Sequence, residues 1–566
     1  MSYLGKDAKI QIAHKWVDGL GPDGGCWADE KKVLPLSELL QGGAPLPILR
    51  GLDSAVAHGL PVAKILGKGC NLNWEHIQCM ERVFQKVTHF NLADNKILAD
   101  GAEVLSQALQ RSEVAVHVDI SSNNIKPEGM KCLETAITES NHLKDTLQCL
   151  CVSRNAIKEA GAKLVVNVVQ KCTNLTELYV AYNEIGVGGA ESLWQICLTL
   201  EVLDVAGNKI LAVGANHISN GIEKSSSIRV LNLGWNGIGD VEMELLTKIQ
   251  KLPRSKQSPQ GSPDARGASR SPRGSAGIPL SDEARKANPS RAAGFQQSTT
   301  DAEDAEDAQE EIGSIKDSDG MQRLANALKA NGSLKDIDLS GNGIGVGGAI
   351  VLSEVIGADD AVVEKLVLAH NEFGEQGADY FCRGLHSCKS ITHINLFNNS
   401  LRAEGSRHIC DAITKESSIT VLDLGYNCLE DEGAKHVALA ITRGRLQKVS
   451  LAGNNIGDTG AIALFEAIKE RIPTTTTAQL VDVDLWNNRI GNEGVSKLLE
   501  QSPMQAGWSR ADLSGNIMSE DMKLKLESIF SAEQLILEGM VPRPPVEKEN
   551  AQPASLWCRQ PRESAE

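Results

Sequence analysis

Aspartates recur at one position of a repeating pattern in this chain, and their type and spacing could do chemistry. Each lies four residues before an asparagine; they are Asp119, Asp204, Asp338, Asp423, Asp484 and Asp512. On successive strands about 5 Å apart, two such carboxylates could act as a pair of catalytic acids. We prefer the alternative, in which they are the first polar row of an exposed sheet face and make that face acidic.

Histidines and cysteines are the side chains that could bind a transition metal. His89, His117 and His393 each lie six residues before an asparagine, and the first two fall on adjacent strands without a third ligand. The 13 cysteines include no C-x-x-C pair and no His/Cys cluster at zinc spacing. We therefore expect no metal site, and interpret the cysteines as free, mostly buried thiols of a reducing compartment.

Glycines are frequent, so a phosphate-binding loop is the next kind of site to consider. No G-x-x-x-x-G-K-[ST] motif occurs, and segments such as 341–345 (Gly-Asn-Gly-Ile-Gly) have the form of turns between repeats. We expect neither a nucleotide site nor any other cofactor.

Aromatic residues make up only 4% of the chain, so their positions are informative. Six of them lie one, two or four residues before a repeat asparagine: Tyr179, Tyr182, Trp235, Phe397, Tyr426 and Trp486. Tyr and Trp dominate the energetics of protein interfaces, which favours a role as anchors for a partner. The alternative is that the rings pack against one another across neighbouring strands.

The elements that must position these side chains repeat along the chain. A segment of the form Leu-x-Leu-x-x-Asn-x-Ile recurs thirteen times, most often 28 residues apart, with its asparagine at 95, 123, 155, 183, 208, 236, 342, 371, 399, 427, 454, 488 and 516. That period and signature indicate a leucine-rich repeat solenoid. The fold class is therefore α/β, a horseshoe with a parallel sheet on its concave face and helices on its convex face.

Each repeat has an expected internal structure. In the segment Leu178–Ile185, alternation points Leu178, Val180 and Ile185 inward and Tyr179 and Tyr182 outward. The asparagine amide is expected to satisfy backbone groups of its own coil and of the neighbouring coil. Six residues after eleven of these asparagines stands a glycine, expected either for close approach of the helix or for a positive φ.

The pattern divides the chain into five parts. We expect a helical cap at 1–62, repeat blocks at 63–250 and 312–530, a disordered linker at 251–311 and a disordered tail at 531–566. The repeats of Asn236 and Asn516 lack the glycine, which is typical of terminal caps. One interrupted horseshoe and two tethered arcs both remain possible, and we favour the first because 312–333 has the form of half a repeat.

Charge bounds the kinds of partner. The net charge is −16, so the chain as a whole would repel nucleic acids and anionic membranes, and a basic protein is the expected partner. The linker is basic from 251 to 300 and acidic from 301 to 311, and Ser258, Ser262 and Ser271 precede prolines as candidate phosphorylation sites. Without an apolar leader or an 18-residue apolar run, we expect a cytoplasmic protein, with the nucleus as an alternative. We also expect a monomer.

The segment LDLGYNCLEDEGAKHVALAI, from Leu422 to Ile441, resembles the ribonuclease-inhibitor class of leucine-rich repeats. The resemblance covers about 63–250 and 312–530, and it is stronger to the C-terminal repeats of NOD-like receptors, whose nucleotide-binding module is absent here. It implies a scaffold or regulator that binds proteins on its concave face without catalysis.

Two alternatives rest on the same resemblance. Ran GTPase-activating proteins share this repeat type and carry an acidic region, and Arg154 is the residue that could stabilise charge in such a role. Similar arrays also serve as structural components of cilia and flagella.

Overall fold

A computed structural model of the chain describes residues 33–36, 46–59, 62–239, 320–470, 480–499, 508–532 and 534–537. The basic and acidic linker with Ser258, Ser262 and Ser271, most of the N-terminal segment and the end of the C-terminal tail lie outside these residues.

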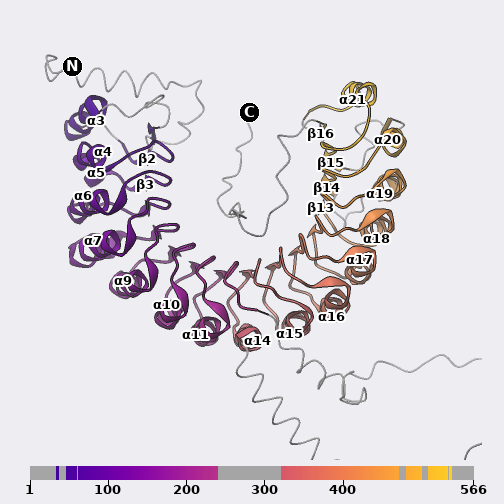
Figure 1. Cartoon of the computed structure of the whole chain (residues 1–566), viewed down its shortest axis with the longest axis horizontal. Helices are drawn as coiled ribbons and strands as arrows, with labels where there is room; N and C mark the ends of the chain where they lie inside the picture. The colour runs from indigo at the N-terminus through magenta and orange to yellow at the C-terminus, as the bar shows by residue number, and fades with distance from the viewer. Residues whose placement is uncertain are drawn as a thin grey trace, which may run out of the picture. The chain divides into compact units, whose positions relative to one another are not determined.

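The described strands form one parallel sheet whose order follows the chain from β1 to β16 (Figure 1). They are β1 (Val33–Pro35), β2 (Lys64–Leu66), β3 (His89–Asn91), β4 (His117–Asp119), β5 (Cys149–Cys151), β6 (Glu177–Tyr179), β7 (Val202–Asp204), β8 (Val230–Asn232), β9 (Asp336–Asp338), β10 (Lys365–Val367), β11 (His393–Asn395), β12 (Val421–Asp423), β13 (Lys448–Ser450), β14 (Leu480–Asp484), β15 (Trp508–Asp512) and β16 (Leu535–Ile536). Because neighbouring strands are parallel and consecutive in the chain, each coil consists of one strand and one segment that returns to the next strand. This arrangement confirms the leucine-rich repeat solenoid.

Helices return the chain from one strand to the next and lie on the opposite side from the sheet (Figure 1). They are α3 (Leu46–Ala57), α4 (Trp74–Gln78), α5 (Glu81–Lys86), α6 (Leu98–Gln110), α7 (Lys126–Glu139), α8 (Leu143–Thr146), α9 (Lys158–Lys171), α10 (Gly186–Leu193), the 3-10 helix η2 (Trp194–Leu198), α11 (Leu211–Lys224), α14 (Gly320–Ala330), α15 (Val346–Ile356), α16 (Gly374–Ser387), α17 (Arg402–Asp411), α18 (Glu430–Arg443), α19 (Asp458–Glu470), α20 (Asn492–Leu499) and α21 (Glu520–Glu527).

The core lies between the sheet and the helices. Leu178, Val180 and Ile185 are at most 1% exposed, whereas Tyr179 and Tyr182 are half-buried on the other face of the sheet. The strand alternation expected from the sequence is therefore confirmed.

The repeat asparagines tie neighbouring coils together. The Nδ2 of Asn208 donates to the carbonyl of Val180 in the preceding coil at 3.0 Å and to that of Val205 in its own coil at 2.8 Å. Its Oδ1 accepts from the backbone N–H of Asn183 at 2.8 Å. One buried side chain thus satisfies backbone groups of two coils that would otherwise be unpaired.

Close approach, rather than a positive φ, explains the repeat glycines. A Cβ on Gly189 would lie 2.1 Å from Cγ2 of Ile185 and 3.1 Å from Cβ of Ala162 in the preceding coil. No room remains for a larger side chain where one helix begins against its neighbour.

The two repeat blocks form one continuous sheet. Strand β8 pairs with β9 in register, Leu231 opposite Ile337, and Oδ1 of Asn342 accepts from the N–H of Asn236 at 3.0 Å. Helix α14 packs between α11 and α15 and so completes the coil that β8 begins. The repeat of Asn236 is therefore no terminal cap, because residues 240–319 are inserted between its strand and its helix. Gly320 supplies the close approach, since its Cβ would lie 2.6 Å from the backbone of Ala212.

Both ends of the sheet extend beyond the expected boundaries. The N-terminal segment expected to be a helical cap contains β1, which pairs with β2, as well as α3. At the other end β16 pairs with β15, so the repeat of Asn516 is not the last coil and the tail does not begin at 531. Neither strand is followed by the repeat asparagine, and each pairs with one neighbour only at its end of the described sheet.

Candidate functional site

The face of the sheet that points away from the helices, here called the inner face, presents the same set of positions in every coil. Side chains six and four residues before the repeat asparagine face away from the helices, and those one and two residues before it lie at the turn that ends the strand. The residues singled out in the sequence fall in these rows.

The aspartate row has a structural function that sequence reasoning missed. Oδ1 of Asp204 accepts a hydrogen bond from the N–H of Ala206 at 3.0 Å, and Oδ1 of Asp423 accepts one from Gly425 at 2.9 Å. The other aspartates of the row make the same contact, and so do Asn91, Asn232 and Asn395. Aspartate and asparagine accept this backbone hydrogen bond equally well, so the residue at this position forms an Asx turn at the end of the strand.

Burial weakens the acidity of part of this row. Desolvation raises the pKa of Asp204 to about 7, and the nearby Asp338 carboxylate adds to the rise. Desolvation also raises the pKa of Asp423 to about 6, with Asp484 acting in the same direction. The inner face is thus less negative near neutral pH than the count of aspartates indicates.

We expect Asp204→Asn to change how stability depends on pH. A carboxyl whose folded-state pKa is raised favours the folded state below its unfolded pKa near 4, and this contribution is lost as the pH rises through about 7. The amide keeps the turn hydrogen bond without the charge, so the variant should be more stable at pH 8 by on the order of 1–3 kcal/mol. Urea unfolding at several pH values measures this. A wild-type decline between pH 4 and 7 that persists in the variant would contradict it.

Aromatic rings form a row along the strand ends. Ring centroids are separated by 5.3 Å between Trp235 and His370, 5.1 Å between His370 and Phe397, 5.0 Å between Phe397 and Tyr426, and 6.2 Å between Tyr426 and Trp486. All five rings are half-buried. Phe397 thus contacts rings of both adjacent coils, whereas the contacts Trp235–His370 and Tyr426–Trp486 each span one intervening coil. Because every ring also keeps an exposed edge, neither interpretation of the sequence excludes the other.

Glycines in the following coil make room for these rings. A Cβ on Gly341 would lie 2.4 Å from the ring of Trp235, and one on Gly453 would lie 2.7 Å from the ring of Tyr426. Tyr182 covers Gly207 in the same way, at 2.3 Å. Each ring lies over the next coil, and together Tyr182, Trp235, His370, Phe397, Tyr426 and Trp486 are here called the aromatic row.

Four members of the aromatic row have left-handed backbone conformations. The φ angles are +55° at Tyr182, +59° at Trp235, +58° at His370 and +56° at Tyr426. Some other coils place glycine at the equivalent position, as at Gly207 with φ +65°, and others place a polar residue there, as at Ser122 with φ +57°. A bulky residue in this region costs about 1–2 kcal/mol, which glycine avoids. Retaining rings at a strained position is a pattern that favours a functional role for them.

The strain predicts a reversal of the usual order of alanine and glycine. At Tyr426 we expect the glycine variant to be more stable than the alanine variant by about 1 kcal/mol, because only glycine adopts this φ without strain. At Tyr380, inside α16, the order should invert by about the same amount. Denaturant midpoints of the four variants check this. Alanine as the more stable variant at both positions would refute it.

The remaining predicted residues lie beside the aromatic row. The guanidinium of Arg154 lies over the ring of Tyr182, 4.2 Å from the ring centroid. This contact holds the Arg154 side chain along the sheet. Tyr179 lies on β6, where its hydroxyl donates to Glu177 at 3.3 Å, and burial raises its pKa. His370 belongs to the row although the sequence analysis missed it; its place directly before Asn371 was the available signal.

A histidine–cysteine group on the inner face corrects the expectation that no third ligand accompanies His89 and His117. His117 on β4 is in register with Cys149 on β5, and the ligand atoms of His117, Cys149 and Cys151 all lie within 4.8 Å of one another. The rings of His89 and His117 stack with centroids 5.9 Å apart. The signal was present in the sequence, because Cys149 and Cys151 stand six and four residues before Asn155.

The two cysteines and the histidine also influence one another electrostatically. The hydrogen bond with Cys151 and that with His117 lower the pKa of Cys149 to about 7, against the effect of burial. The same contact with Cys149 raises the pKa of His117. All 11 cysteines in the described part of the chain are outside disulfides, and seven of them are buried.

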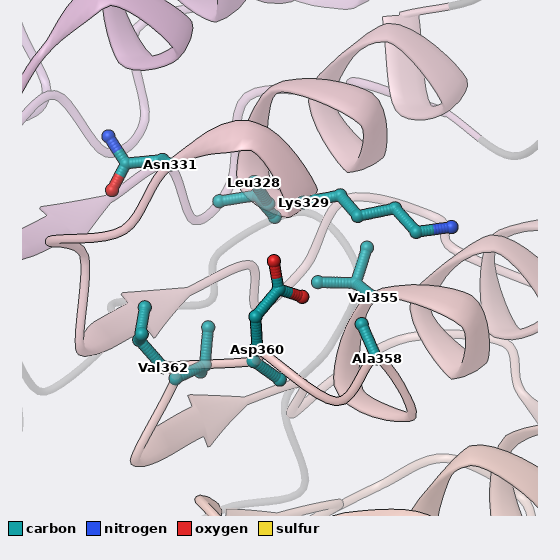
Figure 2. Close-up of a pocket in the computed structure, with 9 residues that line it drawn as sticks. Leu328, Lys329, Asn331, Val355, Ala358, Asp360 and Val362 are labelled. Carbon is teal, nitrogen blue, oxygen red and sulfur yellow. The ribbon is translucent and has the colours of Figure 1, made fainter.

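One pocket among the described residues lies on the helical side, at the ends of α14 and α15 (Figure 2). It offers about 10 Å³, the space of a single water-sized sphere. Asn331 at its margin is engaged elsewhere, since its Nδ2 donates to the carbonyl of Ile222 at 2.7 Å. This pocket cannot hold a nucleotide or a coenzyme.

No helix of the described ranges has the length and apolar character needed to cross a bilayer.

Comparison with known proteins agrees with the architecture. A family model described as a leucine-rich repeat matches residues 116–133, 171–193, 224–244, 330–353, 416–438, 446–465 and 480–499. The NACHT, LRR and PYD domains-containing protein 14 of Mus musculus is 26% identical over 172 residues, 30% of this chain and 17% of its own length. Protein 2 of the same series from Homo sapiens is 30% identical over 154 residues, 26% of this chain and 14% of its own length.

Two further proteins match this chain, one in sequence and one in structure. The leucine-rich repeat-containing protein 45 of Gallus gallus is 31% identical over 85 residues, 15% of this chain and 12% of its own length. A crystal structure of the yeast Rad7 and Elc1 complex aligns with a TM-score of 0.40 at 12% identity, covering 94% of this chain and 92% of the solved one. The chain spans less than a fifth of each curated relative named here.

The fold and the family model define a leucine-rich repeat protein. Segments of this chain are similar in sequence to segments of the NACHT, LRR and PYD domains-containing proteins.

Proposed function

We propose that this protein binds another protein on the inner face of its sheet, with the aromatic row as the anchor, and acts as a scaffold or regulator without a reaction of its own. The observation that carries the proposal is the aromatic row itself, in which four of the six rings occupy left-handed positions and all six remain half-exposed. Rings that served packing alone could be replaced by glycine without strain, as several coils do.

The rigidity of the face supports high affinity. The strands that carry the row are joined by the continuous ladder of one sheet, and the repeat asparagines fix each turn. A preformed surface loses little conformational entropy on binding, so more of the contact energy appears as affinity.

The chemistry of the face favours a partner that presents cations. Half-buried carboxylates at Asp119, Asp338, Asp484 and Asp512 flank rings whose faces attract guanidinium and ammonium groups. We propose a basic protein segment as the ligand, bound by a monomer in the reducing environment of the cytoplasm. Net charge of −16 also disfavours nucleic acid.

The proposal is tested by unbiased capture. The wild-type chain and a variant with Trp235 and Trp486 replaced by alanine are used as baits, and proteins captured by the first but not the second are candidate partners. Trp74→Ala is the matched control, because Trp74 is 43% exposed on the helical side, at the start of α4. Identical captures by wild type and the double variant would refute binding through the aromatic row.

A further inference from the structure

We propose that His117, Cys149 and Cys151 form a three-ligand site for Zn²⁺ on the inner face of the sheet. The site is independent of the aromatic row, which lies at the strand ends. It rests on the positions of three side chains from two adjacent strands.

The spacing of the ligand atoms fits tetrahedral coordination. The sulfurs of Cys149 and Cys151 are 3.7 Å apart. Two thiolates that bind one Zn²⁺ at about 2.3 Å, with a tetrahedral angle between them, are roughly 3.8 Å apart. The imidazole of His117 is within 4.8 Å of both sulfurs, so a modest rotation of its side chain completes three corners of the tetrahedron. The cysteines therefore need almost no rearrangement to bind the ion.

The sheet explains why these atoms converge. Residues two apart on one strand point to the same face, which brings Cys149 and Cys151 together. The parallel register places His117 of β4 directly opposite Cys149. The ring of His89 lies beside that of His117 at an interplanar angle of 12°. The ligands thus stand on rigid elements, as a preorganised metal site requires.

The ligand types select the metal. Two thiolates and one imidazole are soft and borderline donors, which suit Zn²⁺ and exclude Mg²⁺ or Ca²⁺. Cys149 is 5% exposed, whereas Cys151 and His117 are half-buried, so the site opens toward the inner face. Three protein ligands leave the fourth position for water or for a side chain of a bound protein.

A second histidine–cysteine group on the helical side provides a comparison. Asp379 and Cys382 on α16 and His408 on α17 also have ligand atoms within 4.8 Å of one another. There Asp379 is ion-paired with Arg383 at 2.7 Å, and Sγ of Cys382 donates to the carbonyl of Asp379 at 3.0 Å. A metal ion at this second group would have to break the ion pair between Asp379 and Arg383, so we expect the group to bind metal less well.

Titration of the full-length reduced chain with Co²⁺ tests the site, because thiolate-bound tetrahedral Co²⁺ has a charge-transfer band and intense visible bands. We expect one equivalent with these bands, displaced by Zn²⁺. Replacing Cys149 and Cys151 together by serine should abolish them. His117→Gln should retain the charge-transfer band and weaken Co²⁺ affinity by at least about 10-fold. Cys382→Ser is the matched control and should change neither.

Three results would overturn the proposal: no tetrahedral bands in the wild type, bands that survive loss of both cysteines, or bands that disappear in Cys382→Ser. If the double variant does not fold, Cys151→Ser alone decides, since this position is half-buried and serine is nearly isosteric. The charge-transfer band should then fall to about half or less, and an undiminished band would refute the site.

Discussion

Replacing Asn427 by alanine is expected to lower the free energy of unfolding by about 3–5 kcal/mol. Asn427 is fully buried, and its Nδ2 donates to the carbonyls of Leu396 at 2.8 Å and Leu424 at 3.0 Å. Its Oδ1 accepts from the N–H groups of Asn399 at 2.8 Å and Leu401 at 3.2 Å. Alanine would leave these backbone groups unpaired in a site closed to water.

The size of this effect follows from where the partners lie. Each buried backbone group left without its hydrogen bond costs about 1–3 kcal/mol, and this substitution removes partners from two coils at once. A solenoid coil is stabilised by its neighbours, so the coils around Asn427 should also exchange amide hydrogens faster. Urea unfolding and hydrogen exchange measure the two consequences.

Asn141→Ala is the matched control for Asn427→Ala. Asn141 is exposed in the bend that follows α7, so the stability of this variant should stay within about 0.5 kcal/mol of wild type. Equal effects of the two substitutions would contradict the role assigned to the asparagine ladder.

The second large effect concerns binding. Trp235→Ala combined with Trp486→Ala should weaken partner capture by more than about 2 kcal/mol, roughly 30-fold in Kd. The two rings lie at opposite ends of the run from Trp235 to Trp486, in contact with His370 and Tyr426 respectively. Their loss removes apolar contact area at both ends and leaves the neighbouring rings less well supported.

The fold should survive this change, because neither indole belongs to the core between sheet and helices. We therefore expect an unchanged circular dichroism spectrum for the double variant. Titration of an identified partner gives the two dissociation constants, and Trp74→Ala should match wild type. Unimpaired binding by the double variant would leave the aromatic row without a role in recognition.

Much of this protein follows from local sequence. The spacing of Leu178, Val180 and Asn183 predicts a strand, a turn and an inward asparagine, and the structure confirms each of these. The aspartates were placed on the correct face for the same reason, since alternation along a strand fixes the side on which a residue lies. The rings one and two residues before the asparagine lie in the turn, where alternation does not apply. The Asx turn at Asp204 was missed because the sequence pattern does not distinguish a polar surface position from a capping one.

The joint between the blocks depended on contacts between distant segments. Composition places a linker at 251–311, but only packing against α11 shows that α14 is the helix of the coil that β8 begins. Corresponding positions in successive coils are likewise separated by variable lengths, as between Asn123 and Asn155, which are 32 residues apart. A fixed period of 28 residues therefore does not predict which residues of adjacent coils lie side by side.

What the sequence by itself determined is the repeat, the inner and outer face of each strand and the chemistry of each row. What only the tertiary structure decided is which side chains touch: the successive ring contacts from Trp235 to Trp486, the left-handed φ of Tyr426, and the approach of His117 to Cys149 and Cys151. The physical reason is that the hydrogen-bonded register of a parallel sheet sets neighbours across coils, and this register is formed by backbone groups common to every residue.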